Sequence, residues 1–421
     1  MPATLAEKIV ARASGKPTAR AGEIVTAKVD LVMMHDSGGP RRVAPMLERL
    51  GARVWDPSRV VLVSDHYVPA VDADSAQILS LTRKWAKRED VGAFYDMEGI
   101  CHVLLPERGH LRPGMFAVGG DSHSPTAGAF GCFMFGVGAT EMAGVLVTGE
   151  IWLKVPETHK VRFEGRLGRG LSSKDMMLAL CRVMGLSAVQ YGVIEYAGPA
   201  VAALPMGERM VLTNMSAELG AQTGLIAPDA TTLAALAEVS ALEPGALDWQ
   251  SDEGARYARV WELDASALAP QVAAPHSPVN AAPVSEHAGV AIDQAYIGAC
   301  TGAKIGDLHM AAEVLRGRKV KAGTRLLVAP ASARVTAEAA KDGTLAAITE
   351  AGALLLPSGC GACAGLGAGL LADGEVCIAS TARNFKGRMG SSSAEVFLAS
   401  PYTVAASAVA GRIADPRDFL S

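Results

Sequence analysis

Short apolar runs that end directly in polar or glycine-rich turns recur along this chain, and they constrain its fold more than any other feature. The runs at residues 60–63, 116–118, 354–356 and 376–378 lead into the turns SDH, GGDSH, PSGC and STARNFKGR. Continuous apolar runs of this length are typical of strands buried on both faces of a parallel sheet. Because open α/β sheets bind ligands at the carboxyl ends of their strands, we expect the reactive side chains to converge on one edge.

Length and composition agree with an α/β enzyme of more than one domain. A chain of 421 residues is longer than a single hydrophobic core usually serves, so two or three domains are expected. Half of the residues are hydrophobic, only 5% are aromatic and 45 are glycine. This profile indicates a core of small aliphatic side chains and turns that bring the backbone close to a ligand. We place domains at residues 1–155, 156–275 and 285–421, with a connection rich in Ala, Pro and Val around residues 265–284.

One helix can be placed in detail. Ser172 with Asp175 three residues later predicts a capped helix start, and Gly185 predicts its end. The methionines between them are expected to pack in the core.

Charge and patterning exclude several classes of protein. The net charge is −4 and the chain has no extended basic surface, which argues against nucleic acid binding. The amino-terminal segment lacks the apolar core of a signal peptide, and no stretch approaches the length of a membrane span. Seven cysteines, an odd number, argue against a disulfide framework. We therefore expect a protein of the reducing cytoplasm.

Three of the cysteines lie in glycine-containing turns after apolar runs: Cys300 in AYIGACTGAK, and Cys360 and Cys363 in LLLPSGCGACAG. A structural zinc site would need a fourth nearby ligand, which neither segment supplies. Three thiolates can instead hold an iron-sulfur cluster whose remaining iron is free to act as a Lewis acid. Two alternatives stay open at this point. The C-x2-C pair could be a redox pair, or all seven cysteines could be small buried apolar residues.

The segments around these residues resemble one family along nearly the whole chain. They are VSDHYVPA, GICHVLLPE, GGDSHSPTAGAFGCFMFGVGATEMA, NMSAELGAQTG, SDEGARYA, PHSPVN and NFKGRMGSSSAEVFLASPYTVAASAVAG, together with the two cysteine turns. On these motifs the chain is similar to the aconitase superfamily, in particular to the large subunits of the 3-isopropylmalate dehydratase and homoaconitase type. The resemblance implies a three-domain aconitase-like α/β fold, with parallel-rich sheets flanked by helices around a central cluster site, and a hydro-lyase activity.

The resemblance also implies a role for individual residues. Cys300, Cys360 and Cys363 match the ligands of a 4Fe-4S cluster. The catalytic residues that it implies are Asp65, His66, His102, Asp121, Ser122, His123 and Glu218. The substrate-binding residues that it implies are His35, Asn214, Lys304, Arg383 and Arg388. Among them, Asp65 and His66 match the pair that protonates the departing hydroxyl.

These roles suit the dehydration of a 2-hydroxy acid. That reaction removes a weakly acidic proton beside a carboxylate and expels hydroxide, which is a poor leaving group. A Lewis-acidic iron weakens the C–O bond, and an imidazolium held by a carboxylate delivers a proton. Arginine offers the planar fork that a substrate carboxylate needs.

Two departures from the family pattern concern the substrate. Family members commonly read C-T-N-G-R after the first cluster cysteine, where this chain reads CTGAK, and N-R-N-F, where this chain reads ARNF. Neither change touches the cysteines, so we expect the reaction to persist and the substrate pocket to differ. Besides isopropylmalate, the candidate substrates are 2,3-dimethylmalate, citramalate, and malate or maleate. A homoaconitase or aconitase-type isomerase is the alternative activity.

Two other classes stay open, namely an iron-sensing relative and a non-cluster enzyme whose thiols hold a single metal. The family takes its catalytic base from a serine in a Tyr-Gly-x-Gly-Ser-Ser-Arg turn on a swivelling domain. This chain has no such turn, because residues 391–393 lie in GRMGSSSAE. We therefore expect a heterodimer with a small subunit that carries the swivel domain, a small hydroxy-dicarboxylate substrate, and neither nucleic acid nor membrane as a partner.

Overall fold

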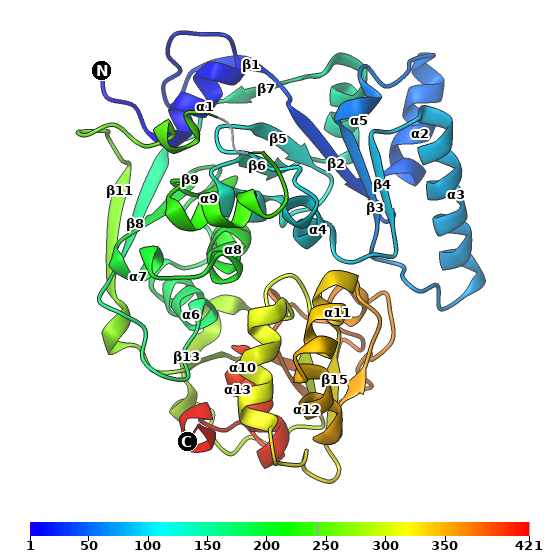
Figure 1. Ribbon diagram of the computed structural model, residues 1–421, viewed down its shortest axis with the longest axis vertical. Helices are drawn as coiled ribbons and strands as arrows, with labels where there is room; N and C mark the ends of the chain where they lie inside the picture. The colour runs from blue at the N-terminus through cyan, green and yellow to red at the C-terminus, as the bar shows by residue number, and fades with distance from the viewer. Residues whose placement is uncertain (242–243, 421) are drawn as a thin grey trace.

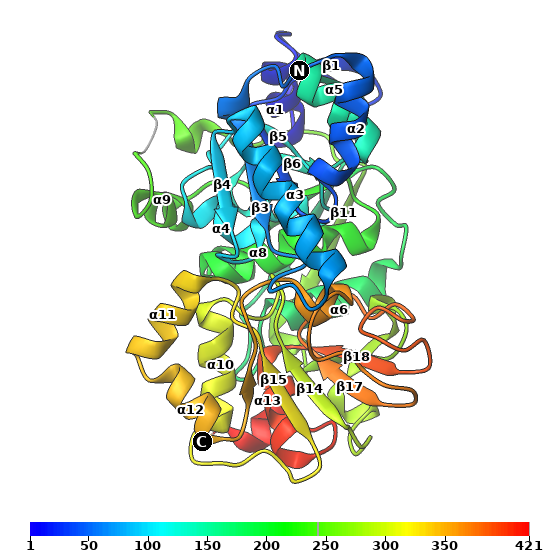
Figure 2. The ribbon, with the colours of Figure 1, turned by 90° about the vertical axis from the view of Figure 1, so that its right-hand side faces the viewer.

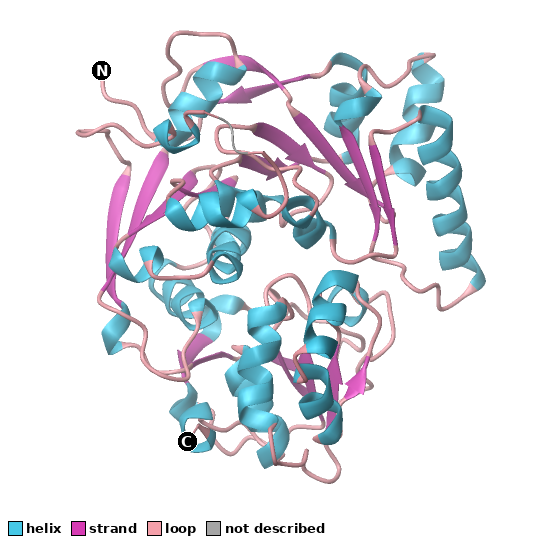
Figure 3. Cartoon of the chain, in the orientation of Figure 1, coloured by secondary structure: helices cyan, strands magenta, loops and turns pink. Residues whose placement is uncertain are grey.

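Three parallel-rich sheets organise the part of the chain that the computed structural model describes, residues 1–241 and 244–420. Each sheet takes its strands from one stretch of sequence, and helices flank the sheets (Figure 3). The first two sheets lie in the upper part of the molecule and the third fills a lower lobe (Figure 1). This α/β arrangement agrees with the fold class that the sequence predicts.

The first sheet is fully parallel, with the strand order β4-β3-β2-β5-β6. Its strands are β2 (Leu31–His35), β3 (Val60–Ser64), β4 (Ala93–Asp96), β5 (Phe116–Gly119) and β6 (Phe133–Gly136). Its helices are α1 (Leu5–Ala13), α2 (Pro40–Leu50), α3 (Ala73–Glu89), α4 (Cys101–Glu107) and α5 (Ala139–Thr148). An antiparallel ribbon of β1 (Ile24–Lys28) and β7 (Glu150–Lys154) lies beside it. The strands predicted at residues 60–63 and 116–118 are confirmed.

Burial explains why these central strands are continuously apolar. Every residue of β2, β3 and β5 is buried. Successive side chains of a strand point to opposite faces, so Val60 and Leu62 enter one apolar cluster while Val61 and Val63 enter another. The two faces of the sheet are therefore both covered, as the unbroken apolar runs require.

The second sheet is also fully parallel, with the order β10-β9-β8-β11. Its strands are β8 (Thr158–Glu164), β9 (Val193–Ala197), β10 (Thr223–Ile226) and β11 (Arg259–Asp264). Its helices are α6 (Ser173–Met184), α7 (Pro199–Ala202), α8 (Met206–Met215) and α9 (Ala230–Ala237). Ser172 and Asp175 form a capping box at the start of α6, and Gly185 follows its end, which confirms the helix predicted there.

The third sheet has the order β13-β12-β18-β17-β14-β15-β16 and is parallel from β18 to β16. Its strands are β12 (Gln271–Ala273), β13 (Ala281–Pro283), β14 (Gln294–Ile297), β15 (Arg325–Val328), β16 (Leu354–Leu355), β17 (Val376–Ala379) and β18 (Glu395–Ala399). Its helices are α10 (Ile305–Leu315), α11 (Ala333–Lys341), α12 (Thr344–Glu350) and α13 (Pro401–Ala410). The strands expected near residues 354 and 376 are present. The first was expected to be buried but is the last strand of the sheet order, and Leu354 is 60% exposed at this edge.

The chain connection expected around residues 265–284 takes part in this sheet. Both β12 and β13 fall inside it and pair antiparallel with each other. The division into domains at 1–155, 156–275 and 285–421 stays a prediction, and β12 of the third sheet lies before the boundary drawn at 275. No helix among the described residues is long and apolar enough to cross a membrane.

The first and third sheets lie one above the other, and the turns after their strands meet between them (Figure 2). The backbone N–H of Cys360, which lies beyond the end of β16, donates a 2.8 Å hydrogen bond to the carbonyl of Asp65, which follows β3. The fold thus joins the carboxyl ends of two separate sheets.

Candidate active site

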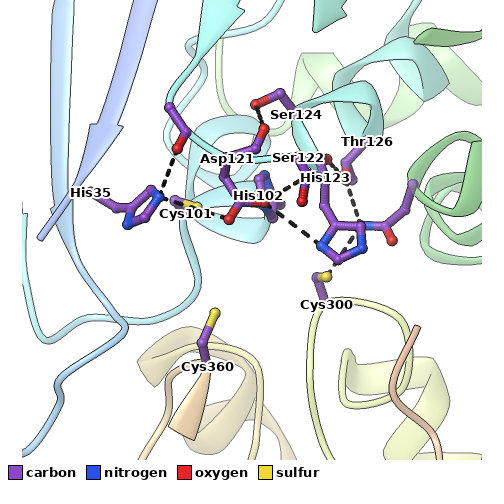
Figure 4. Close-up of polar contacts among 12 residues, drawn as sticks. His35, Cys101, His102, Asp121, Ser122, His123, Ser124, Thr126, Cys300 and Cys360 are labelled. Atoms are coloured by element: carbon purple, nitrogen blue, oxygen red, sulfur yellow. Dashed lines mark hydrogen bonds and ion pairs between the residues drawn. The ribbon is translucent and has the colours of Figure 1, made fainter. Parts of the chain in front are cut away.

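Most of the residues that the sequence singles out lie at these strand ends. His35 is the last residue of β2, and the turns after β3, β5, β14, β16 and β17 carry Asp65 and His66, Asp121 to His123, Cys300, Cys360, and Arg383. Figure 4 shows Cys300 and Cys360 rising from the lower lobe toward the group around Asp121. The convergence predicted from the strand-and-turn pattern is therefore seen, and it joins two sheets rather than one edge.

Asp36 shapes the turn that carries Asp65 and His66. Its carboxylate accepts hydrogen bonds from the backbone N–H groups of Asp65 (3.3 Å), His66 (3.0 Å) and Tyr67 (2.9 Å). Adjacent residues of a straight strand point to opposite faces, so this turn is what allows the two side chains to meet. Sequence reasoning missed Asp36. Its signal was its position directly after His35 at a strand end, in the same HDSGGP motif.

Asp65 and His66 form a buried acid–imidazole pair. The Nδ1 atom of His66 lies 2.7 Å from Oδ1 of Asp65, whose other oxygen accepts the backbone N–H of Cys101 at 2.8 Å. Burial alone would lower the pKa of His66, but the charge and hydrogen bond of Asp65 outweigh it and raise the pKa to about 9. Burial likewise opposes ionisation of Asp65, yet His66 holds the pKa of that carboxyl at about 2. The pair is thus an imidazolium and a carboxylate near neutral pH.

His35 lies flat against His66, with the two ring centroids 4.0 Å apart. Its Nε2 atom is 3.0 Å from the carbonyl of Gly120, and its Nδ1 atom accepts the backbone N–H of Gly38 at 3.3 Å. A carbonyl only accepts and an N–H only donates, so these partners fix the neutral tautomer with the proton on Nε2. Burial and the neighbouring charge of His66 both lower the pKa of His35. Its two nitrogens therefore already have partners.

Asp121 is the central carboxylate of the site. Its oxygens lie 2.9 Å from Nε2 of His102 and 3.7 Å from Nε2 of both His35 and His66. It also accepts the backbone N–H of His123 at 2.7 Å. Burial would raise the pKa of this carboxyl, but the hydrogen bond and charge of His102 and the other histidines hold it well below its usual range.

Glu218 links the region of the second sheet to Arg383, which follows β17 of the third sheet. Glu218 lies 3.1 Å from Nε2 of His123 and accepts a 2.7 Å hydrogen bond from Nε of Arg383, which also donates to the hydroxyl of Ser122 at 2.8 Å. Burial would raise the pKa of Glu218, but the hydrogen bond of His123 and the charge of Arg383 lower it. Burial and Arg383 lower the pKa of His123. Arg383 is thus held between the first and second sheets.

The three cysteines of the motif lie near one another and are free thiols. Burial raises the pKa of Cys300, Cys360 and Cys363, and each of the three pairs also interacts electrostatically. The amide of Asn214 donates to Sγ of Cys300 at 3.1 Å and to the hydroxyl of Thr126 at 2.8 Å. Its carbonyl oxygen is buried without a partner.

Arg388 also belongs to the surroundings of these thiols. Its charge and hydrogen bond act on the thiol of Cys363, against the effect of burial on that pKa. Its Nε atom is buried and has no hydrogen-bond partner. An arginine held in this way has donor capacity left for a further acceptor.

Lys304 occupies a different place. Its ammonium contacts Oδ2 of Asp307 at 2.7 Å and the carbonyl of Cys300 at 3.1 Å, and its side chain is buried. It ties the carbonyl of Cys300 to Asp307, and these two contacts use two of the three donors of its ammonium group.

A hollow of about 660 Å³ opens beside Asp121, Ser122 and Arg383. Trp152 and Tyr191 line it and are 71% and 57% exposed. The site is therefore open to a large surface hollow with apolar side chains on its wall.

Sequence comparisons with known proteins show the family of the chain. The model of the aconitase family (aconitate hydratase) matches residues 7–289 and 286–411. The chain belongs to the aconitase family. It is 46% identical over 418 residues to a 3-isopropylmalate dehydratase large subunit from Methanopyrus kandleri, with 99% of each chain covered. It is 43% identical over 420 residues to one from Hydrogenobaculum, with 99% of this chain and 98% of the relative covered.

A third relative carries a different name. The chain is 44% identical over 417 residues to a homoaconitase large subunit from Thermus thermophilus, with 99% of this chain and 98% of the relative covered. The family and these relatives make this chain an enzyme of the hydro-lyase class. The resemblance drawn from the sequence motifs is confirmed.

Proposed function

We propose that the chain is the large subunit of a hydro-lyase that reversibly dehydrates a substituted malate of the 3-isopropylmalate type, with a 4Fe-4S cluster held by Cys300, Cys360 and Cys363. The observation that carries the proposal is the meeting of two sets of residues. A buried acid–imidazole pair from the first sheet lies beside the cysteine turns of the third sheet, with Sγ of Cys360 3.9 Å from Oδ2 of Asp65.

The three thiols suit a cluster better than a single ion. Thiolates that share one tetrahedral metal with bonds of about 2.3 Å would lie roughly 3.8 Å apart. The groups whose ligand atoms all lie within 4.8 Å, among the described residues, are those of His35, Asp36, Asp65 and His66 and of His102, Asp121 and His123. The three cysteines are not one of these groups. A cluster spreads its ligands over several irons, and with three cysteines it leaves one iron for Lewis-acid chemistry on the hydroxyl and carboxylate of a substrate.

The residues of the chain would carry out proton transfer and orient the substrate. We assign to His66 the protonation of the departing hydroxyl, because Asp65 keeps it charged and Asp36 fixes its turn. His102, Asp121, His123 and Glu218 orient the reacting groups through the hydrogen bonds that link them.

Arg383 and Arg388 would bind the substrate carboxylates. Arg383 lines the hollow, and Arg388 lies by Cys363 with its Nε–H unpaired. For the remaining residues of the predicted site, Asn214 contacts a ligand sulfur and Ser122 positions Arg383. Substrate contact by His35 and Lys304 stays a prediction.

The candidate substrates differ in the side chain that they carry. Two relatives are named for 3-isopropylmalate and one for homoaconitase at similar identity. The replacements in CTGAK and ARNF leave 2,3-dimethylmalate, citramalate, malate or maleate as further candidates. The homoaconitase type is the second function that we propose to test.

A small subunit with the swivel domain is the partner that we propose, because the relatives are named as large subunits. The hollow that contains Trp152 and Tyr191 borders Ser122 and Arg383, so a partner seated there would reach the site and could supply the base. Seven free cysteines and an oxygen-sensitive cluster fit the reducing cytoplasm, which we propose as the location.

The test is anaerobic reconstitution of the chain, with and without the small subunit, followed by iron and sulfide analysis and a substrate screen. About four irons and four sulfides per chain are expected. One metal without sulfide would support the single-metal alternative. Turnover of a substituted malate is expected only with the small subunit present, and substantial turnover by this chain alone would contradict the two-subunit assignment.

A further inference from the structure

Lys174 is a buried cation outside the predicted site. It is the second residue of α6, beside the second sheet, and is 1% exposed. Its ammonium donates three hydrogen bonds, and all three acceptors lie in turns of the third sheet. They are the hydroxyl of Thr301 (3.1 Å) and the carbonyls of Ser380 (2.9 Å) and Thr381 (2.7 Å). These bonds use the whole donor capacity of the ammonium group.

The acceptors suit the charged form of this lysine. Two of them are carbonyls, which can only accept, and the hydroxyl of Thr301 lies 2.9 Å from the carbonyl of Ser380, to which it can donate its own proton. With that bond made, all three groups take a proton from Lys174, and only an ammonium has three to give. Burial lowers the pKa of Lys174 to about 8, so the ammonium is the main form at neutral pH.

Its surroundings make this cation costly by themselves. Burial disfavours a charge, and the first turn of a helix disfavours a positive one. Arg209, the other fully buried cation of these helices, pairs with Asp229 at 2.7 Å. Lys174 forms no such ion pair with a carboxylate among the described residues. A thiolate at Cys300, and then Asp307 and a thiolate at Cys363, would favour its charge, whereas the neighbouring cation Lys304 opposes it.

The position of Lys174 connects two parts of the site. Thr301 directly follows Cys300, and Thr381 lies two residues before Arg383. One ammonium thus fixes the turn of a proposed cluster ligand against the turn of a proposed substrate arginine. When the thiols become thiolate ligands, the same charge lies beside them.

We propose that Lys174 is a positioning residue that holds the Cys300 and Arg383 turns together and offsets the negative charge of the thiolate ligands. This inference rests on the proposed cluster. Residues behind metal ligands orient them and tune the metal, and their loss typically weakens metal binding about 10-fold or more.

The experiment compares the wild-type two-subunit complex with Lys174→Gln, Lys174→Met and Lys174→Arg, and uses Arg209→Met as the matched loss of another buried cation. Thermal unfolding of each metal-free large subunit is measured first. After reconstitution, the measurements are the rate of iron release to a chelator, the midpoint potential of the cluster, and kcat and KM.

Lys174→Gln keeps donor groups and removes the charge, and Lys174→Arg keeps the charge. We expect iron release from Lys174→Gln and Lys174→Met to be about 10-fold faster than from wild type. Their midpoint potentials should be lower, because a lost positive charge disfavours the added electron. KM should rise as the Arg383 turn loosens, and Lys174→Arg should restore the potential.

Three results would overturn the inference. The first is a folded Lys174→Gln protein with the iron release and potential of wild type. The second is an equal change of the potential in Arg209→Met, which would make the effect a general one of stability. The third is a wild-type complex that binds no iron and sulfide, which would overturn the proposed function as well, so the two failures are distinguishable.

Discussion

Replacing Asp65 with Asn should move the alkaline limit of activity, because Asp65 keeps His66 protonated. The pKa of His66 is about 9 against an ordinary value of 6.5, which corresponds to about 3 kcal/mol of interaction that favours the imidazolium. This gain exists although burial acts against it. In Asp65→Asn the carboxylate charge is lost and the burial stays, so we expect the pKa of His66 to fall toward 6.5.

The sign of the pH effect follows from the role of His66 as an acid. Activity needs the protonated ring and is lost as the pH rises through its pKa. With a pKa that falls from about 9 to about 6.5, the protonated fraction at about pH 8 drops roughly 30-fold, and kcat/KM should drop by the same factor. At pH values below both pKa values the ring is protonated in either protein, so the loss should be much smaller.

The assay is the pH profile of kcat/KM for the reconstituted complex, followed by the ultraviolet absorbance of the unsaturated product. Asp96→Asn is the matched control, because Asp96 ends the neighbouring strand β4 and pairs with Arg83 at a partly exposed position. An alkaline limit in Asp65→Asn that coincides with that of wild type, at wild-type iron content, would refute the role of His66 as the acid.

Three further outcomes are expected from single substitutions. Cys360→Ser should lose the cluster absorption and turnover. Cys377→Ser, at a thiol buried within β17, should keep both. Full iron occupancy in Cys360→Ser would contradict the ligand assignment. Arg388→Ala should raise KM by a factor of about 10 to 150, because a charge-assisted hydrogen bond contributes roughly 1.5–3 kcal/mol. Arg388→Lys should not restore the KM of wild type. An unchanged KM in both variants would exclude carboxylate binding by Arg388. Trp152→Asp should weaken association with the small subunit in analytical ultracentrifugation, whereas Val260→Asp, on the exposed face of β11, should not. Equal affinities of the two variants for the small subunit would exclude the hollow as the docking surface.

Local pattern was sufficient to predict the strands and the turns of the site. An apolar run followed by a polar turn depends only on neighbouring residues, so Val60 to Val63 and the Asp65–His66 turn could be placed together. The same holds for α6, whose capping box lies within four residues. The exposure of Leu354 could not be predicted, because an edge strand and a buried strand share the same short apolar sequence.

The contacts that organise the site join residues far apart in the chain. Asp36 caps a turn about 30 residues away, and Lys174 binds carbonyls 206 and 207 residues away. Neither residue stands in a motif that demands such a partner. A buried lysine at a helix start looks like an ordinary solvated one until the packing of three sheets is known. The roles assigned to the site residues from the family resemblance stay predictions, although the structure brings most of these residues together.

The site has its reacting parts on different sheets, and this explains why so many buried hydrogen bonds cross between them. The acid and its carboxylate come from the first sheet, and the thiols come from the third. The helices beside the second sheet supply the links, since Asn214 contacts Cys300, Glu218 binds Arg383, and Lys174 fixes the turns of both. The distance from His66 to the thiols therefore depends on how the sheets are held together, rather than on any single loop. A substitution in one of these links can disturb both proton transfer and cluster binding, and that common effect distinguishes the links from residues that serve one task.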